Sequence, residues 1–229
     1  MISFRLWLME SKSVKPTHIG KYKIVYVDSK KFRNSSLENE EFCTVAIHED
    51  FPKSIKKNEI YIDDSVKAHE LPSLLLGLKV RLKDLENLNG SERSYENGQK
   101  AEKSYRKKHK DKITKVKCCI LHDYKNDIQV YYVDGKSVRD NYKTDFSQGG
   151  HGYVYKWIPK DEIWIEKEEK EETQFILSHE YTEMVMMRDM KIAYEKAHSI
   201  ASKIEKELRE TNFKMNDIIK LTRHIKSLF

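Results

Sequence analysis

The sequence predicts an α+β fold in which a hairpin-strand-helix-helix unit occurs twice, with helices packed on small antiparallel sheets. Three observations support this prediction. Short segments alternate apolar and polar residues, as strands with one buried face do, and longer segments repeat apolar residues with the period of a helix. The same order of segments then returns about a hundred residues later, so we expect two copies related by a pseudo-two-fold axis.

The repeat is clearest around a strand that ends in Val-Asp. YKIVYVDSKKFRN (22–34) matches IQVYYVDGKSVRD (128–140), and HEDFPKSIKKNEIYIDD, from His48, aligns without a gap with HGYVYKWIPKDEIWIEK, from His151. Each copy continues into two helical segments, the second entered at Tyr-Glu. We therefore predict an N-terminal degenerate copy at 1–110, a C-terminal copy at 111–210 and a closing amphipathic helix within 211–229.

The elements of each copy follow from period and from turn residues. In the first copy we predict strands at 2–9, 23–27 and 59–62, a loop at 34–41, and helices at 72–88 and 94–109. In the second copy we predict strands at 113–121, 128–133 and 162–165, a flexible glycine loop at 149–152, and helices at 173–190, 193–210 and 213–229.

Composition limits the class of protein. The chain is 35% charged and 38% hydrophobic with a formal charge of +6, which is typical of a soluble globular protein and permits nucleic-acid contact without requiring it. We expect no membrane span, no signal peptide and, from only three cysteines, no disulfide framework, so the expected location is cytoplasmic. The abundance of Lys, Glu, Ile and Tyr suggests a thermophile.

The segment TQFILSHEYTEMVMMRDM (173–190) carries the candidate site. On a helix His179 and Glu183 lie one turn apart on the same face, with Glu180 beside them, while most of the segment is apolar. Buried ionisable groups lose hydration worth several kcal/mol unless they are paired or bound to a metal. The alternative is that the two glutamates face water and that the histidine is an ordinary core residue.

The first copy tests this hypothesis inside one sequence. The residues that align with the three candidate groups cannot ionise: Leu76, Gly77 and Val80. Gln99 aligns with His198 of the following helix, and His151 alone has an expected counterpart, His48. A task performed by the second copy only would explain this difference.

HEYTE resembles the HExxH motif of zinc peptidases, the zincins, with a glutamate in place of the second histidine. By position, the resemblance makes His179 and Glu183 ligands and Glu180 the general base that activates water. His198 is the expected third ligand. His151 is the next choice as a ligand, and otherwise a catalytic residue that binds substrate or stabilises an oxyanion.

The second copy also resembles an uncharacterised family of archaeal, bacterial and phage proteins. Three segments carry this resemblance: GGHGYVYKWIPKDEIWI, HEYTE and YEKAHSIASKIE. The pattern of the family has a Gly-Gly-His loop, an EIWI strand, a His-Glu-x-x-Glu helix and a Tyr-x-x-Ala-His helix. The resemblance covers residues 133 to about 205 and implies no activity. It adds further residues of interest: Arg139, Asp145 and Glu162.

The sequence therefore predicts a metal-dependent, peptidase-like hydrolase with a divalent ion such as zinc and a protein or peptide as substrate. The metal ligands are His179, Glu183 and His198, and the catalytic residues are Glu180 and His151. One alternative is a non-catalytic binding or assembly protein whose His/Glu cluster is structural. Another is a nucleic-acid-binding protein or nuclease that uses the basic run at 103–117. The oligomeric state stays open.

Overall fold

The computed structural model describes residues 15–35, 42, 44–87, 90–109, 116–124 and 128–211. Main-chain contacts divide the chain into two compact units, Met1–Lys112 with Lys143–Asp145, and Ile113–Tyr142 with Phe146–Phe229. The fold is α+β, and the described residues form six α-helices and two mixed sheets of four strands each. The predicted strand at 2–9, most of the predicted loop at 34–41 and the predicted helix at 213–229 lie outside the described residues.

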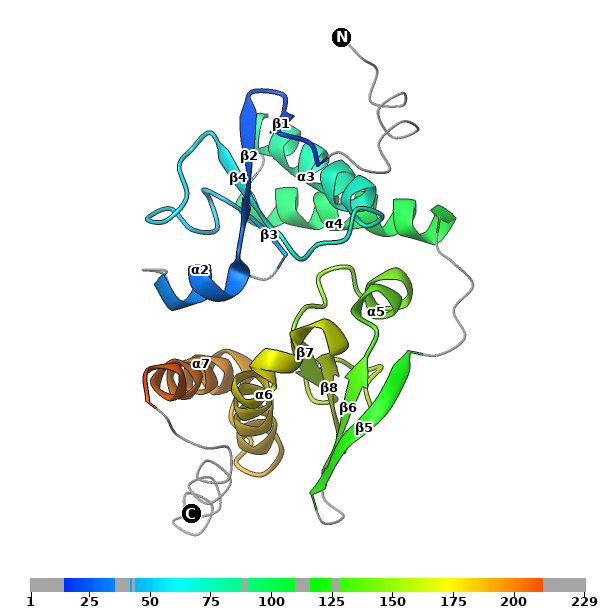
Figure 1. Cartoon of the computed structure of the whole chain (residues 1–229), viewed down its shortest axis with the longest axis vertical. Helices are drawn as coiled ribbons and strands as arrows, with labels where there is room; N and C mark the ends of the chain where they lie inside the picture. The colour runs from blue at the N-terminus through cyan, green and yellow to red at the C-terminus, as the bar shows by residue number, and fades with distance from the viewer. Residues whose placement is uncertain are drawn as a thin grey trace. The chain divides into compact units, whose positions relative to one another are not determined.

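The first unit is a four-stranded sheet with two long helices (Figure 1). Its elements are β1 (His18–Ile19), β2 (Tyr22–Val27), α2 (Ser29–Ser35), β3 (Val45–Ile47), β4 (Glu59–Asp63), α3 (Leu71–Glu86) and α4 (Ser91–His109). The strand order is β1-β2-β4-β3. The leucines of α3 pack on Ile24, Ile60 and Ile62 of the sheet, and α4 packs on α3.

The second unit repeats this plan (Figure 1). Its elements are β5 (Lys117–Tyr124), β6 (Ile128–Val133), α5 (Gly135–Asn141), β7 (Gly149–His151), β8 (Glu162–Glu166), the 3-10 helix η1 (Lys167–Glu172), α6 (Thr173–Arg188) and α7 (Tyr194–Glu210). The strand order is β5-β6-β8-β7, α6 packs against β7 and β8, and α7 packs against α6.

The prediction of antiparallel sheets is wrong at the centre of each sheet. β2 pairs with β4 in parallel, as β6 does with β8, whereas the outer pairs are antiparallel. A parallel pair needs a crossover connection. Here a short helix and an edge strand make it, and both are too short to give a periodic signal in the sequence.

The predicted flexible loop at 149–152 is also wrong, because Gly149–His151 form the edge strand β7. In the pairing with β8, His151 stands opposite Ile163, and in the first unit Ile47 stands opposite the aligned Ile60. Ile47 rather than His48 therefore occupies the strand position of His151. The expected histidine counterpart is one residue out of register.

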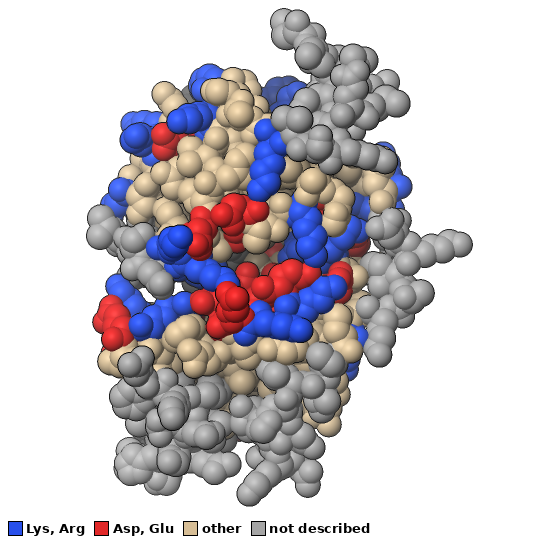
Figure 2. All heavy atoms as spheres, in the orientation of Figure 1, with Lys and Arg blue, Asp and Glu red and all other residues tan. Residues whose placement is uncertain are grey.

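The surface carries charges of both signs. On the face shown in Figure 2, basic and acidic side chains are interspersed over the coloured residues. In the described part of the chain, none of the helices combines the length and the apolar character that crossing a membrane requires.

The Val-Asp turn of the second unit caps a helix. Asp134 Oδ1 accepts hydrogen bonds from the backbone nitrogen of Ser137 at 2.8 Å and from its hydroxyl at 2.7 Å, and Oδ2 pairs with the Lys167 ammonium. Burial acts to raise the pKa of Asp134, but the bonds from Lys167 and Ser137 outweigh it and hold the pKa well below its ordinary value of 3.8.

We predict that Asp134→Ala lowers the free energy of unfolding by about 1 kcal/mol at pH 7, because α5 loses its cap. A carboxylate with a depressed folded-state pKa stabilises the protein above its ordinary pKa, and this stabilisation is lost as the pH falls below about 4. Urea titrations from pH 7 to 3 should therefore show the gap between variant and wild type closing. Asp161→Ala, at an exposed position, is the control, and a gap that stays constant with pH would contradict the assignment.

Candidate metal centre

Ionisable side chains from three elements of the second unit converge. His151 comes from β7, His179, Glu180 and Glu183 come from α6, and His198 comes from α7. Their donor atoms form two groups, His179/Glu183/His198 and His151/Glu180/Glu183, each with all atoms within 4.8 Å of one another. The structure thus brings together all five residues that the sequence nominated.

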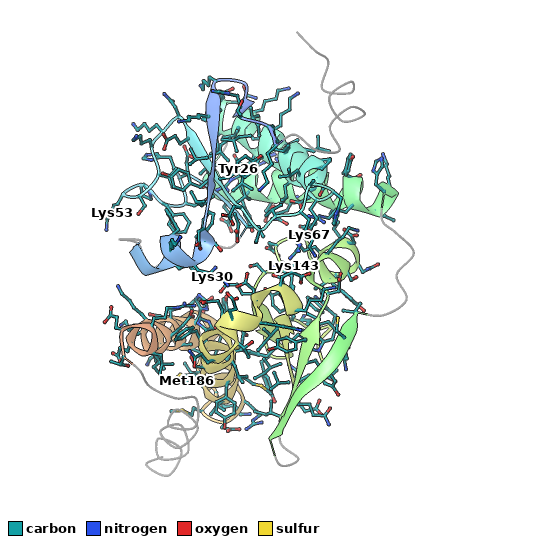
Figure 3. All side chains as sticks on the ribbon, in the orientation of Figure 1. Tyr26, Lys30, Lys53, Lys67, Lys143 and Met186 are labelled. Carbon is teal, nitrogen blue, oxygen red and sulfur yellow. The ribbon has the colours of Figure 1, made fainter. Side chains whose placement is uncertain are left out.

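The local sequence explains how α6 reaches this place. The helix packs on the isoleucines of β6 and β8 through its apolar residues. These are Ile176, Leu177, Tyr181, Met184 and Val185. Met186, labelled in Figure 3, is only 5% exposed, so the helix is buried on nearly every side. On α7 the residues Ala197 and Ala201 are fully buried, and their small size lets α7 approach until the ring of His198 touches α6.

Three of these donor atoms form a tight triangle. His198 Nδ1 lies 2.8 Å from Glu183 Oε2 and 3.1 Å from His179 Nε2, and His179 Nε2 lies 3.6 Å from Glu183 Oε2. A tetrahedral zinc ion with bonds of about 2.0–2.1 Å separates its ligand atoms by about 3.4 Å. The triangle therefore has nearly the size of one face of such a site, and its two-histidine, one-glutamate composition is one that zinc accepts.

His151 has a different role from the other two histidines. Its Nδ1 accepts a hydrogen bond from the backbone nitrogen of Tyr153 at 3.2 Å, so its Nε2 carries the proton and donates to Glu183 Oε1 at 2.9 Å. The ring is 0% exposed. These bonds favour a donor that orients Glu183 over the sequence-based alternative in which His151 is itself a ligand.

Glu183 is held as a carboxylate. Burial acts to raise its pKa, but the hydrogen bonds from His151 and His198, together with the nearby His179 ring, outweigh the burial and hold the pKa well below its usual range. The side chain is 3% exposed. It therefore offers a permanent negative charge, with Oε1 engaged by His151 and Oε2 directed at the triangle.

Glu205 is the functional residue that the sequence analysis missed. Its Oε2 lies 3.1 Å from His179 Nδ1, and Arg209 binds its other oxygen. Burial acts to raise the pKa of Glu205, but His179 and Arg209 lower it to about 2. A signal was present, because Ala197, Ala201 and Glu205 recur every four residues on the buried face of α7.

The further residues suggested by the family resemblance do not join the centre. Arg139 pairs with Glu166 and donates to the carbonyl of Phe146. Glu162 accepts from Lys117 at 2.5 Å and from the indole of Trp164 at 2.7 Å. Asp145 groups by its contacts with the first unit.

Comparisons of the chain with protein-family models, with curated proteins and with solved structures find no match. The functional assignment therefore depends on the geometry and chemistry of these side chains.

The segment that follows His151 is closely packed. A Cβ added at Gly152 would lie 2.3 Å from the carbonyl oxygen of Pro159 and 2.6 Å from that of Ile158. Both neighbours are backbone atoms, which cannot rotate away. Glycine is required here by close approach.

We predict that Gly152→Ala lowers the free energy of unfolding by about 1–3 kcal/mol, because the backbone around His151 must shift. The comparison is Gly90→Ala, where an added Cβ meets nothing within 4 Å and where only the smaller cost of alanine at the start of α4, under about 1 kcal/mol, is expected. Chemical denaturation of both variants is the measurement. Equal effects at the two positions would show that the segment is not constrained as described.

Proposed function

We propose that the chain is a metal-dependent hydrolase of the peptidase-like type whose centre lies in the second unit. One divalent ion, with zinc the best match, binds His179 Nε2, His198 Nδ1 and Glu183 Oε2. The observation that carries the proposal is the triangle of these atoms, with sides of 2.8, 3.1 and 3.6 Å and two of its three residues buried. Three protein ligands leave a fourth position for water or substrate, as catalytic zinc sites do.

Glu180 is the general base of this proposal. It follows His179 directly on α6, and its carboxylate lies within 4.8 Å of the donor atoms of His151 and Glu183. A bound ion would lower the pKa of its water towards neutrality, so that a nearby carboxylate can take the proton. A protein or peptide substrate follows from the likeness of HEYTE to the zincin motif.

Metal binding requires only a small change at His198. Each of the three imidazoles has a carboxylate partner at 2.8–3.1 Å. The side chain of His198 is 33% exposed, whereas that of His179 is 5% exposed. The proton on His198 Nδ1 can therefore exchange through solvent to Nε2, which frees Nδ1 for an ion.

The same hydrogen bonds favour a second candidate function, a non-catalytic binding or assembly protein in which the cluster locks β7, α6 and α7 together. Metal analysis separates the two functions. For the nucleic-acid alternative, the interspersed charges in Figure 2 add no support.

We also infer that the two units arose by duplication and that the first is a degenerate copy. Both sheets have the same strand order. In each, the central parallel pair contains one of the two aligned strands, β4, which begins at Glu59, or β8, which begins at Glu162. In the first unit, α3 and α4 approach closely at Gly77 and Gly98, where an added Cβ would meet the opposite backbone at 2.8–3.0 Å. Among the described residues, both potential ligand groups lie in the second unit.

We predict that protein purified without a His tag binds about one equivalent of zinc in competition with a chromophoric chelator. His179→Ala, His198→Ala and Glu183→Gln should each weaken binding by roughly 100-fold or more, because each removes one of three ligands. His69→Ala, at an exposed position, is the control. Less than about a tenth of an equivalent, unchanged after incubation with zinc or manganese, would reject the proposal.

We predict that Glu180→Gln keeps its zinc but slows hydrolysis by roughly 100-fold or more, since the amide cannot accept a proton from water. A quenched fluorescent peptide library, read with zinc-loaded wild type and variant, measures this. Cleavage by the variant at the wild-type rate would exclude Glu180 as the base. Cleavage by neither protein would leave no support for a peptide substrate.

A further inference from the structure

The Nδ1 atom of His179, on the side of the ring away from the triangle, contacts the carboxylate of Glu205. We propose that Glu205, held by Arg209, is a positioning residue that fixes the tautomer of His179 and so sets the metal affinity of the site. The inference deepens the proposed function and rests on it for the identity of the ligand atoms.

The contact is one link in a continuous chain of polar side chains. Glu205 Oε2 lies 3.1 Å from His179 Nδ1, and Glu205 Oε1 accepts from Arg209 Nε at 3.0 Å and Nη2 at 2.7 Å. Arg209 Nη1 in turn donates to Glu172 Oε2 at the end of η1. The guanidinium also lies over the ring of Phe175, 4.4 Å from its centroid. Arg209 is thus fixed by three neighbours.

For a neutral His179 ring, the donors and acceptors along this chain permit one arrangement of protons. Arg209 donates to Oε1 and, with His179, keeps Glu205 ionised, so Oε2 is an acceptor as well. His179 Nδ1 must then be the donor to Oε2, which leaves the lone pair of a neutral ring on Nε2. Nε2 is the atom that faces His198 and Glu183. The tautomer needed for metal binding is therefore selected before any ion arrives.

The distribution of bonds distinguishes this role from that of an ordinary ion pair. Of the bonds that Arg209 makes, the two to Glu205 both fall on Oε1, which leaves Oε2 to His179. Side chains of this pair are 10–11% exposed, so water competes little for Oε2. A carboxylate behind a metal-bound imidazole fixes its orientation and increases its basicity. Glu205 does for His179 what His151 does for Glu183.

The test is Glu205→Gln, which keeps the shape of the side chain and removes its charge. We expect the zinc dissociation constant to rise roughly 10- to 100-fold in chelator competition, as loss of such a partner usually causes. The matched control is Glu207→Gln, the same change at an exposed position of α7, which should leave the constant within about two-fold. Unchanged affinity in a folded Glu205→Gln variant would overturn the inference.

A second measurement reports on the tautomer itself. Long-range ¹H–¹⁵N correlation spectra of metal-free protein should show His179 protonated at Nδ1 in the wild type and in Glu207→Gln, and a mixture of tautomers in Glu205→Gln. A purely structural ion pair would lower the melting temperature without changing this spectrum. An unchanged spectrum would therefore also overturn the inference.

Two further measurements distinguish failure of this inference from misfolding of the variant and from failure of the proposed function. If Glu205→Gln does not fold, Arg209→Gln replaces it and should weaken zinc binding in the same direction, since Oε2 is then free to turn away; an unchanged constant counts against the inference. If wild type binds no zinc, the proposed function fails, and the spectra alone then decide whether Glu205 selects the tautomer.

Discussion

Glu183 is a carboxylate buried between three imidazoles, and the arrangement of the second unit depends on satisfying it. An isolated charge in such a place would be destabilised by several kcal/mol, so each oxygen must meet a donor. His151 reaches Oε1 from β7, and His198 reaches Oε2 from α7. This requirement places three elements in one register: the sheet edge must lie close to α6, and α7 must cross it at Ala197 and Ala201.

The described residues of the first unit form a sheet and helices of the same order without such a cluster. The unit's buried charges are paired in ordinary ways, Arg81 with Asp50 and Arg106 with Glu70 and Glu102. Its helices meet closely at Gly77 and Gly98, which align with Glu180 and Ala197 of the second unit. Since the sheet and helices form there without a buried His/Glu cluster among the described residues, we take the cluster of the second unit as support for the proposed task.

How far the sequence predicted this structure depended on the length of each element. The strand at 128–133 was predicted with its observed bounds, and the helices at 173–190 and 193–210 within two residues, because each contains a full period of apolar residues. α2, α5, β3 and β7 were missed, since three to seven residues carry no such period. The parallel central pairing was missed for the same reason.

The site followed a similar rule. His179 and Glu183 were found from i, i+4 spacing, and His198 and His151 from their absence or presence in the other copy, although Ile47 and not His48 occupies the strand position of His151 in the first unit. Glu205 escaped because a glutamate on a polar helix is common. Only the packing of α7 on α6 shows that its carboxylate faces inward, towards His179.

The hydrogen-bonded network and the proposed metal site require nearly the same arrangement of side chains. The three atoms are now 2.8–3.6 Å apart, and a tetrahedral ion would hold them at about 3.4 Å. The 2.8 Å and 3.1 Å sides would lengthen by about 0.6 and 0.3 Å, the 3.6 Å side would shorten by about 0.2 Å, and one proton would shift on a partly exposed ring. His151 and Glu205 keep Glu183 and His179 oriented throughout. Little reorganisation would then oppose binding, which is the property that favours a metal site over a merely structural cluster.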